Sequence, residues 1–303
     1  MKYSLIGALL LLTLAAKAQS TKSHIIKFRW DKLDSTKIEK SPFFITSIQD
    51  SRRDTTESLG RAKIEALGFN VENAHKFTDP SGEQGYIVEG DIFLTEEYIL
   101  NEMSAREIVP GIEEEHYSTN NLVTGGPQTL KIYVDPNFSN FYVQATDIAI
   151  ARYNAENLDL QFTRVTSNGR KRVKADISIV AFYEGPSGGY ITLGSAGFPT
   201  RRGKAYNKIN LNTYYYDTFN DVDALATTIA HEMGHCIGFR HTDYMDRSFS
   251  CGGDYANEGA SSIGANHIPG TPTGPENGSW MLSCSGGDNP FSNNDKTALD
   301  YLY

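Results

Sequence analysis

The chain has 303 residues, of which 39% are hydrophobic and 21% are charged, and its formal net charge is −9. This length and hydrophobic content suffice for one or two ordinary cores. The mildly acidic balance excludes a large basic surface, so we expect no nucleic-acid partner.

The N-terminus has the pattern of a secretory signal peptide. After the charged end Met1-Lys2, an apolar run extends from Leu5 to Ala16, and Ala16-Lys17-Ala18 fits the small-x-small rule for cleavage. Residues 1–18 are therefore expected to be removed and the protein to be secreted, either outside the cell or into a periplasm. The run is too short to favour a membrane anchor, and no later segment is predicted to span a bilayer.

The rest of the sequence divides near residue 121. Residues 19–121, the N-terminal region, hold no Cys and are rich in charge, with a predicted strand at Lys22–Phe28 and a predicted helix at Glu57–Leu67. The break Gly125-Gly126-Pro127 indicates a joint between two parts. Residues 122–303 form the main domain.

The main domain alternates strands and helices. Its predicted strands are residues 130–134, 160–165, 175–182, 191–196 and 208–212. Its predicted helices are residues 140–157, a helix capped by Asn220 or Asp221, and a closing helix that Ser292-Asn293-Asn294-Asp295 can cap and that runs to Leu302. This order predicts an α/β (α+β) fold with a twisted, mixed sheet.

One motif carries the chemistry. His231, Glu232, His235, Gly238 and His241 spell H-E-x-x-H-x-x-G-x-x-H. On a helix, the first two histidines lie one turn apart on the same face. The glycine can take the left-handed conformation that ends a helix, so the third histidine turns back toward them. Three neutral imidazoles leave one tetrahedral position open, as in a catalytic zinc site, and Glu232 stands beside it as a general base.

The helix that carries the motif is predicted to pack on the core along its other side. Its apolar stripe comprises Val222, Leu225, Ala226, Ile229, Met233 and Cys236, nearly opposite His231 and His235. The helix would therefore form the wall of a cleft. The alternative interpretation is a helix with surface histidines and a glycine cap.

The chain has three cysteines, Cys236, Cys251 and Cys284. Export would allow disulfides, and three cysteines leave one unpaired. Since Cys236 lies on the apolar stripe, we expect it to be an inert core thiol. Cys251–Cys284 is the preferred pair, although the sequence does not fix the connectivity.

The main domain resembles the metzincin clan of zinc peptidases over about residues 128–303. The resemblance rests on the zinc motif and on three further segments. Ser279-Trp280-Met281 resembles the Met-turn, in which Met281 forms a hydrophobic floor beneath the histidines. Leu193–Pro199 resembles the upper edge strand, where substrate pairs antiparallel. The fourth feature is the closing helix.

Within the clan, His231–Asp243 and Gly270–Gly287 most closely resemble the bacterial dual-action HEIGH metallopeptidases, with Met233 in place of Ile. One position departs from the related astacins. Ser283 stands where astacins have a further zinc-binding Tyr, so that role is absent here or is filled by another residue.

The N-terminal region has a resemblance of its own. Val88-Glu89-Gly90-Asp91-Ile92 resembles the F-x-G-D motif of astacin propeptides, whose Asp ligates zinc in the latent enzyme. This implies that residues 19–121 are a propeptide and that Asp91 is the latency ligand, with Val88 replacing the usual Phe. A propeptide Cys is excluded, because no Cys precedes His235. The alternative is a simple turn at Gly90-Asp91.

We therefore expect a secreted, monomeric zinc endopeptidase that acts on proteins or peptides and is inhibited by its own propeptide until a cut between about Met103 and Gly126. A zinc amidase acting on cell-wall or short peptides, and a non-catalytic zinc-fold binding protein, are the alternatives. The loop at Thr242–Gly278 is expected to set specificity. Asp243 with Asp246 is a candidate for calcium, the alternative being a solvated turn.

Overall fold

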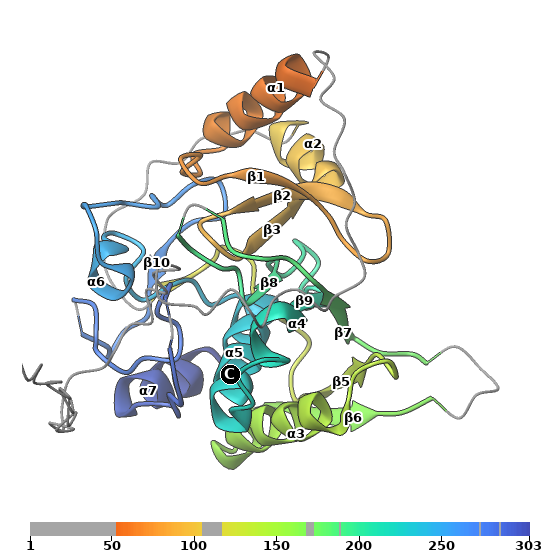
Figure 1. Ribbon diagram of the computed structural model, residues 1–303. Helices are drawn as coiled ribbons and strands as arrows, with labels where there is room; N and C mark the ends of the chain where they lie inside the picture. Colours follow the sequence, from red (N-terminus) through yellow and green to blue (C-terminus); the bar gives the residue numbers. More distant parts are fainter. Residues whose placement is uncertain (1–52, 105–116, 168–172, 188, 273, 285) are drawn as a thin grey trace, which may run out of the picture.

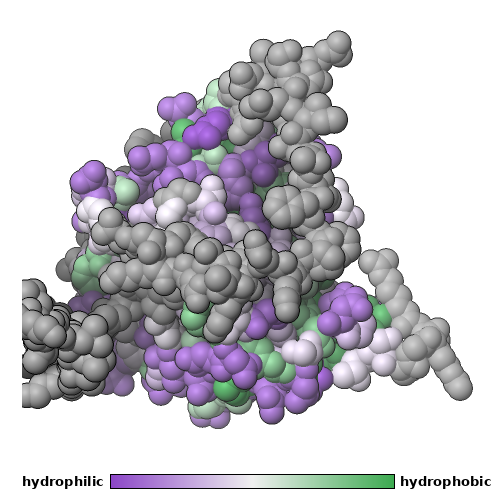
Figure 2. Space-filling view, in the orientation of Figure 1, coloured by the Kyte–Doolittle hydropathy of each residue, from purple (hydrophilic) through white to green (hydrophobic). Residues whose placement is uncertain are grey.

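The computed structural model describes residues 53–104, 117–167, 173–187, 189–272, 274–284 and 286–303 (Figure 1). The predicted signal peptide 1–18 and the predicted strand Lys22–Phe28 lie outside these residues. Within the described ranges, no helix is long and apolar enough to cross a membrane. On the face drawn in Figure 2, hydrophilic residues predominate over the described part, and apolar residues lie scattered among them.

Eight strands of the described residues form one mixed sheet. A mixed sheet is what the sequence predicts for the main domain, but three of these strands come from the N-terminal region. In spatial order they are β1 (His75–Thr78), β2 (Gln84–Val88), β3 (Ile92–Thr95), β8 (Gly194–Ala196), β9 (Lys208–Asn212), β7 (Ile177–Phe182), β5 (Gln128–Val134) and β6 (Leu160–Val165). The pairs β1/β2, β2/β3 and β8/β9 are antiparallel, and the others are parallel. A short second sheet pairs β4 (Tyr117–Ser118) with β10 (Asn266–His267).

The described residues form five longer helices. They are α1 (Arg53–Ala66), α2 (Glu96–Ser104), α3 (Asn140–Ala155), α5 (Val222–Ile237) and α7 (Asn293–Leu302), and the short ones are α4 (Thr213–Tyr216) and α6 (Ser248–Cys251). Helix α2 packs on β2 and β3, α3 packs on β6, and α5 packs on β8 and β9. In Figure 1, α1 and α2 lie beside β1–β3, whereas α3 and α5 lie against each other in the other half of the molecule. The largest core cluster lies between β5, β7, β9, α3 and α5.

The predicted apolar stripe explains how α5 is held. Leu225, Ile229 and Met233 are fully buried in the core cluster. Asp221 caps the helix by accepting hydrogen bonds from two backbone N–H groups. Gly238 ends it at φ 114°, the left-handed conformation expected from the sequence.

The N-terminal region shares the sheet of the main domain. Strand β3 pairs in parallel with β8, with Ile92 opposite Ala196. The segment that resembles an upper edge strand is therefore not an edge in this structure, because β8 pairs with β9 on one side and with β3 on the other. Strand β8 is also shorter than the predicted 191–196, since the Thr192 carbonyl accepts from the Asn212 side chain.

The last residues before the predicted boundary near residue 121 contact the main domain. Tyr117 and Ser118 fall within the N-terminal region as the sequence divides it, yet they pair with β10, and Arg240 N donates to the Tyr117 carbonyl at 2.9 Å. Thr119 N donates to the Gly238 carbonyl at 2.8 Å. Residues 117–119 are thus tied to the end of α5.

Candidate metal centre

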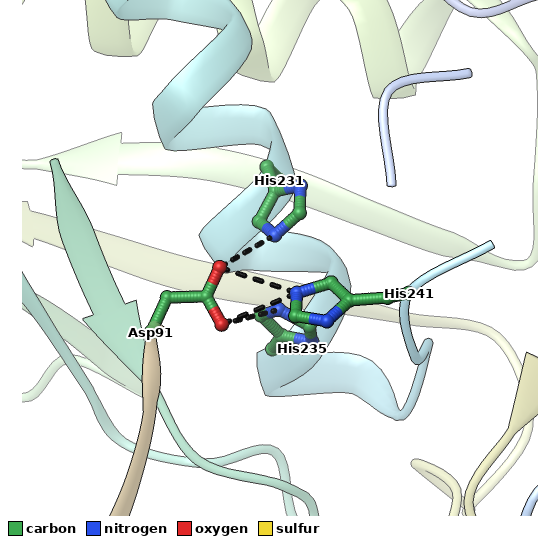
Figure 3. Close-up of side chains that lie close together, drawn as sticks. All are labelled: Asp91, His231, His235 and His241. Atoms are coloured by element: carbon green, nitrogen blue, oxygen red, sulfur yellow. Dashed lines mark hydrogen bonds and ion pairs between the residues drawn. The ribbon is translucent and has the colours of Figure 1, made fainter. Parts of the chain in front are cut away.

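Helix α5 and the turn after it bring three imidazoles together. His231 and His235 lie on one face of the helix with ring centroids 4.7 Å apart. After Gly238 the chain reverses, which places the His241 ring 5.3 Å from His231 and 4.9 Å from His235. Figure 3 shows the three rings facing one point.

Asp91, at the turn between β2 and β3, points its carboxylate at the same place (Figure 3). Its oxygens lie 3.2 Å from Nε2 of His231, 3.2 Å from Nε2 of His241 and 3.8 Å from Nε2 of His235. One ligand atom from each of the four residues lies within 4.8 Å of the others. The structure thus brings together the four residues that the sequence proposes as ligands.

The other nitrogen of each ring is anchored by the protein. Nδ1 of His231 lies 2.8 Å from the Trp280 carbonyl and Nδ1 of His235 lies 2.9 Å from the Phe239 carbonyl. A carbonyl only accepts, so both Nδ1 atoms carry the proton and both Nε2 lone pairs face Asp91. Burial lowers the pKa of His235 well below its ordinary value, and the neighbouring His231 adds to this, which favours the neutral, metal-binding form.

Several atoms around this point have no protein partner. Nε2 of His231, Nε2 of His235 and Oδ1 of Asp91 are buried and make no hydrogen bond within the described part of the chain. Buried polar atoms are rarely left in this state. A zinc ion, which binds nitrogen and oxygen ligands at about 2.0–2.2 Å, would satisfy all three. The residues therefore fit a metal ion.

Glu232 lies next to the ligands, in contact with β8. Its side chain is buried, and Oε2 makes no hydrogen bond among the described residues. A Cβ atom at Gly194 would lie 2.8 Å from Oε1, so only glycine leaves room for the carboxyl there. Burial raises the pKa of Glu232 well above its ordinary value, and the Asp91 carboxylate raises it further.

Ser279–Met281 forms a buried support under the histidines. Met281 is fully buried, and a Cβ at Gly234 would lie 2.5 Å from its Sδ, so the helix and the turn pack in direct contact. The Met281 carbonyl accepts from Thr242 N at 2.8 Å. Asp295, in the first turn of α7, accepts from the Ser279 hydroxyl at 2.7 Å and so ties the closing helix to this turn.

The loop after His241 is held by polar contacts. Ser283, at the position of the astacin Tyr, donates through N and Oγ to Asp243 at 2.9 and 2.8 Å. Asp243 is fully buried and also accepts from Ser250, so it does not lie in a solvated turn. A disulfide joins Cys251 to Cys284, and Cys236 is a free thiol in the core.

Two supporting residues were not anticipated from the sequence. Glu258 is buried, and its oxygens lie 3.0 and 3.1 Å from Nδ1 of His241. Arg240 is buried beside it, with Nη2 3.8 Å from Glu258. Neither residue belongs to a spaced motif. There was one sequence signal, and only for Arg240: it is a charged residue directly before His241, after an apolar stretch.

The centre opens into a cleft of about 1470 Å³. His231, Glu232 and Gly194 line one part of it, and Gly90 and Asp91 line another. Asp91 and His231 thus both border the cleft.

Three imidazoles, an adjacent carboxylate and an open cleft define a metal-dependent hydrolase. The chain belongs to the dual-action HEIGH metallopeptidase family, whose model matches residues 86–303. This confirms the resemblance seen in the sequence. The matched segment begins at Tyr86 and so includes Asp91 as well as the histidines.

Three solved structures also align with part of this chain. Two structures of myroilysin have TM-scores of 0.39 and 0.38 at 12% and 13% identity, cover 60% and 65% of this chain, and are themselves covered to 96% and 97%. High choriolytic enzyme 1, a hatching enzyme zinc-protease from Oryzias latipes (Medaka fish), has a TM-score of 0.30 at 17% identity, with 58% of this chain and 88% of that chain covered. No curated protein matches the chain. The family assignment rests on the family model.

Proposed function

We propose that the protein is a secreted zinc endopeptidase of the metzincin type that is made as a latent zymogen. The observation that carries this proposal is the convergence of three Nε2 atoms on one carboxylate while two of the Nδ1 atoms donate to backbone carbonyls. His231, His235 and His241 would hold zinc, and Met281 would support them from below.

When bound, zinc supplies Lewis-acid chemistry, making water more acidic and polarising a peptide carbonyl. Glu232 accepts the proton of the attacking water and passes it to the leaving amine. The buried position of Glu232 beside the metal ligands suits a group that must hold that proton between the two steps. Gly194 keeps the space in which the carboxyl stands.

Latency follows from the place of Asp91. Its carboxylate would fill the fourth ligand position and exclude water. The neighbouring Gly90 is held to the main domain, because its carbonyl accepts from the Thr192 hydroxyl at 2.9 Å. Strand β3 pairs with β8 in parallel. It therefore occupies the side of β8 on which a substrate strand would pair antiparallel. The N-terminal region thus acts as a propeptide that blocks both the metal and the strand.

The activating cut is expected upstream of Tyr117. Residues 117–119 hydrogen-bond to the end of α5, so a cut before them leaves these contacts in the active enzyme. This narrows the range of Met103 to Gly126 expected from the sequence. We propose that residues 1–18 are the signal peptide. The catalytic domain then begins at Tyr117 and not at residue 122.

Substitution of Asp91 tests the latency. Uncut, zinc-loaded Asp91→Asn protein should hydrolyse casein faster than uncut wild-type protein, but more slowly than cut protein, because β3 still pairs with β8. Limited proteolysis should bring both proteins to the same, higher rate. Equal and full activity of both uncut proteins would show that Asp91 does not block the site.

A further inference from the structure

A second carboxylate of the N-terminal region enters the main domain. Glu89 lies two residues before Asp91 and is buried. Glu89 has φ 54° and Gly90 has φ 97°, so two consecutive residues take the left-handed conformation. This conformation is unfavourable for a residue with a Cβ and persists only where surrounding contacts hold it.

Arg240 binds this carboxylate. Its Nη2 donates to Oε2 of Glu89 at 3.1 Å, and the side chains of both residues are 1% exposed. Its Nη1 donates to the carbonyls of Gly259 and Ala260 at 2.8 and 3.0 Å. Nη1 therefore fixes Arg240 to the main domain, whereas Nη2 donates its hydrogen bond to the N-terminal region.

Arg240 also belongs to the support of the metal site. It directly precedes His241, and its Nη2 lies 3.8 Å from Glu258, which contacts Nδ1 of His241. Glu89 and Asp91 thus contact the two ends of one buried series, Arg240, Glu258 and His241. Asp91 faces the metal position, whereas Glu89 contacts only the arginine end.

We propose that Arg240 is a second binding site for the N-terminal region, specific for a carboxylate and independent of the metal. This inference rests on the proposed latency of the enzyme. Asp91 would hold the N-terminal region through the metal. Glu89, two positions earlier in the sequence, would hold it through Arg240.

The proposal is tested by hydrogen exchange of the backbone amides of residues 84–95, in β2 and β3. The exchange is measured on the full, uncut chain at one pH, first with zinc and then after chelation. Glu89→Gln and Asp91→Asn are compared with Glu97→Gln, which removes an exposed carboxylate from the same region. Loss of a buried hydrogen bond to a charged group should speed this exchange about 10- to 100-fold. We expect this for Glu89→Gln both with and without zinc, and a larger effect of Asp91→Asn with zinc than without.

Exchange in α3 reports whether the main domain remains folded. If Glu89→Gln does not fold, Glu89→Asp replaces it, because it keeps the carboxylate but shortens the side chain. Exchange in Glu89→Gln equal to that in Glu97→Gln, or a Glu89→Gln effect that vanishes on chelation, would overturn the proposal. Exchange needs no catalysis, so a failed peptidase assay of the cut protein would count against the proposed function and not against this site.

Discussion

Glu258 lies within 3.1 Å of Nδ1 of His241 through both carboxylate oxygens, whereas the corresponding nitrogens of His231 and His235 lie against backbone carbonyls. It is therefore the one side-chain carboxylate among the described residues that contacts the Nδ1 atom of a histidine in the centre. Such contacts fix the ring orientation and increase its basicity.

Replacing Glu258 by Gln should weaken zinc binding. The amide keeps the shape but is a poorer acceptor, and loss of such a contact commonly lowers metal affinity about 10- to 100-fold. Competition with a coloured chelator measures the affinity, and Glu97→Gln serves as the control on an exposed carboxylate. An affinity equal to that of wild type would show that Glu258 does not tune the site.

A methyl group at position 194 should impair hydrolysis without removing the metal. Gly194→Ala places Cβ 2.8 Å from Oε1 of Glu232, so the carboxyl must move. We expect kcat of the cut enzyme to fall about 100-fold, the usual scale for a displaced general base. Gly185→Ala is the matched control on the cleft wall, because its nearest contact would be an ordinary 3.4 Å to Tyr214. A zinc content below one per chain in Gly194→Ala would contradict this explanation.

Gly234→Ala should destabilise the main domain although alanine favours helices. The new Cβ would meet Met281 Sδ at 2.5 Å inside a packed core. Overpacking costs about 1–3 kcal/mol, and a contact this close should cost more than the helix-propensity gain of about 1 kcal/mol. Urea unfolding of the full chain measures the difference. An increase in stability would mean that Met281 has free space to move.

Asp79 should make part of the stability sensitive to acid. Burial alone would raise its pKa, but hydrogen bonds from Lys208 and Ser81 outweigh burial and lower it below 3.8. A folded-state pKa below that of the unfolded chain stabilises the protein above the unfolded value, and this stabilisation is lost as the pH falls through the folded pKa.

Asp79→Asn should therefore cost about 1–2 kcal/mol at pH 6, where the hydrogen bond to the ionised carboxylate is lost. The difference from wild type should shrink below about pH 4. Urea unfolding at several pH values measures it. A difference that is constant from pH 6 to pH 2 would exclude the Asp79–Lys208 contact as its source.

The sequence predicted what depends on local spacing. The two histidines four residues apart, the Asp221 cap and the left-handed Gly238 all follow from helix geometry, and the structure confirms them. The strands β5, β6, β7 and β9 likewise follow from short apolar runs bounded by turn residues.

Contacts between distant segments were not predictable in this way. The pairing of β3 with β8 joins residues about a hundred positions apart, and neither segment encodes its partner locally. Glu258 lies in a loop without periodicity, and Asp295 was seen only as a helix-capping residue. Their contacts with His241 and Ser279 depend on the tertiary fold.

In the proposed mechanism, Glu232 performs proton transfer at a zinc site held by three histidines. The most direct test is casein hydrolysis by cut, zinc-loaded Glu232→Ala protein beside cut wild type, with zinc measured in both. We predict one zinc per chain in each protein, with activity in wild type alone. Appreciable hydrolysis by zinc-loaded Glu232→Ala would contradict the account.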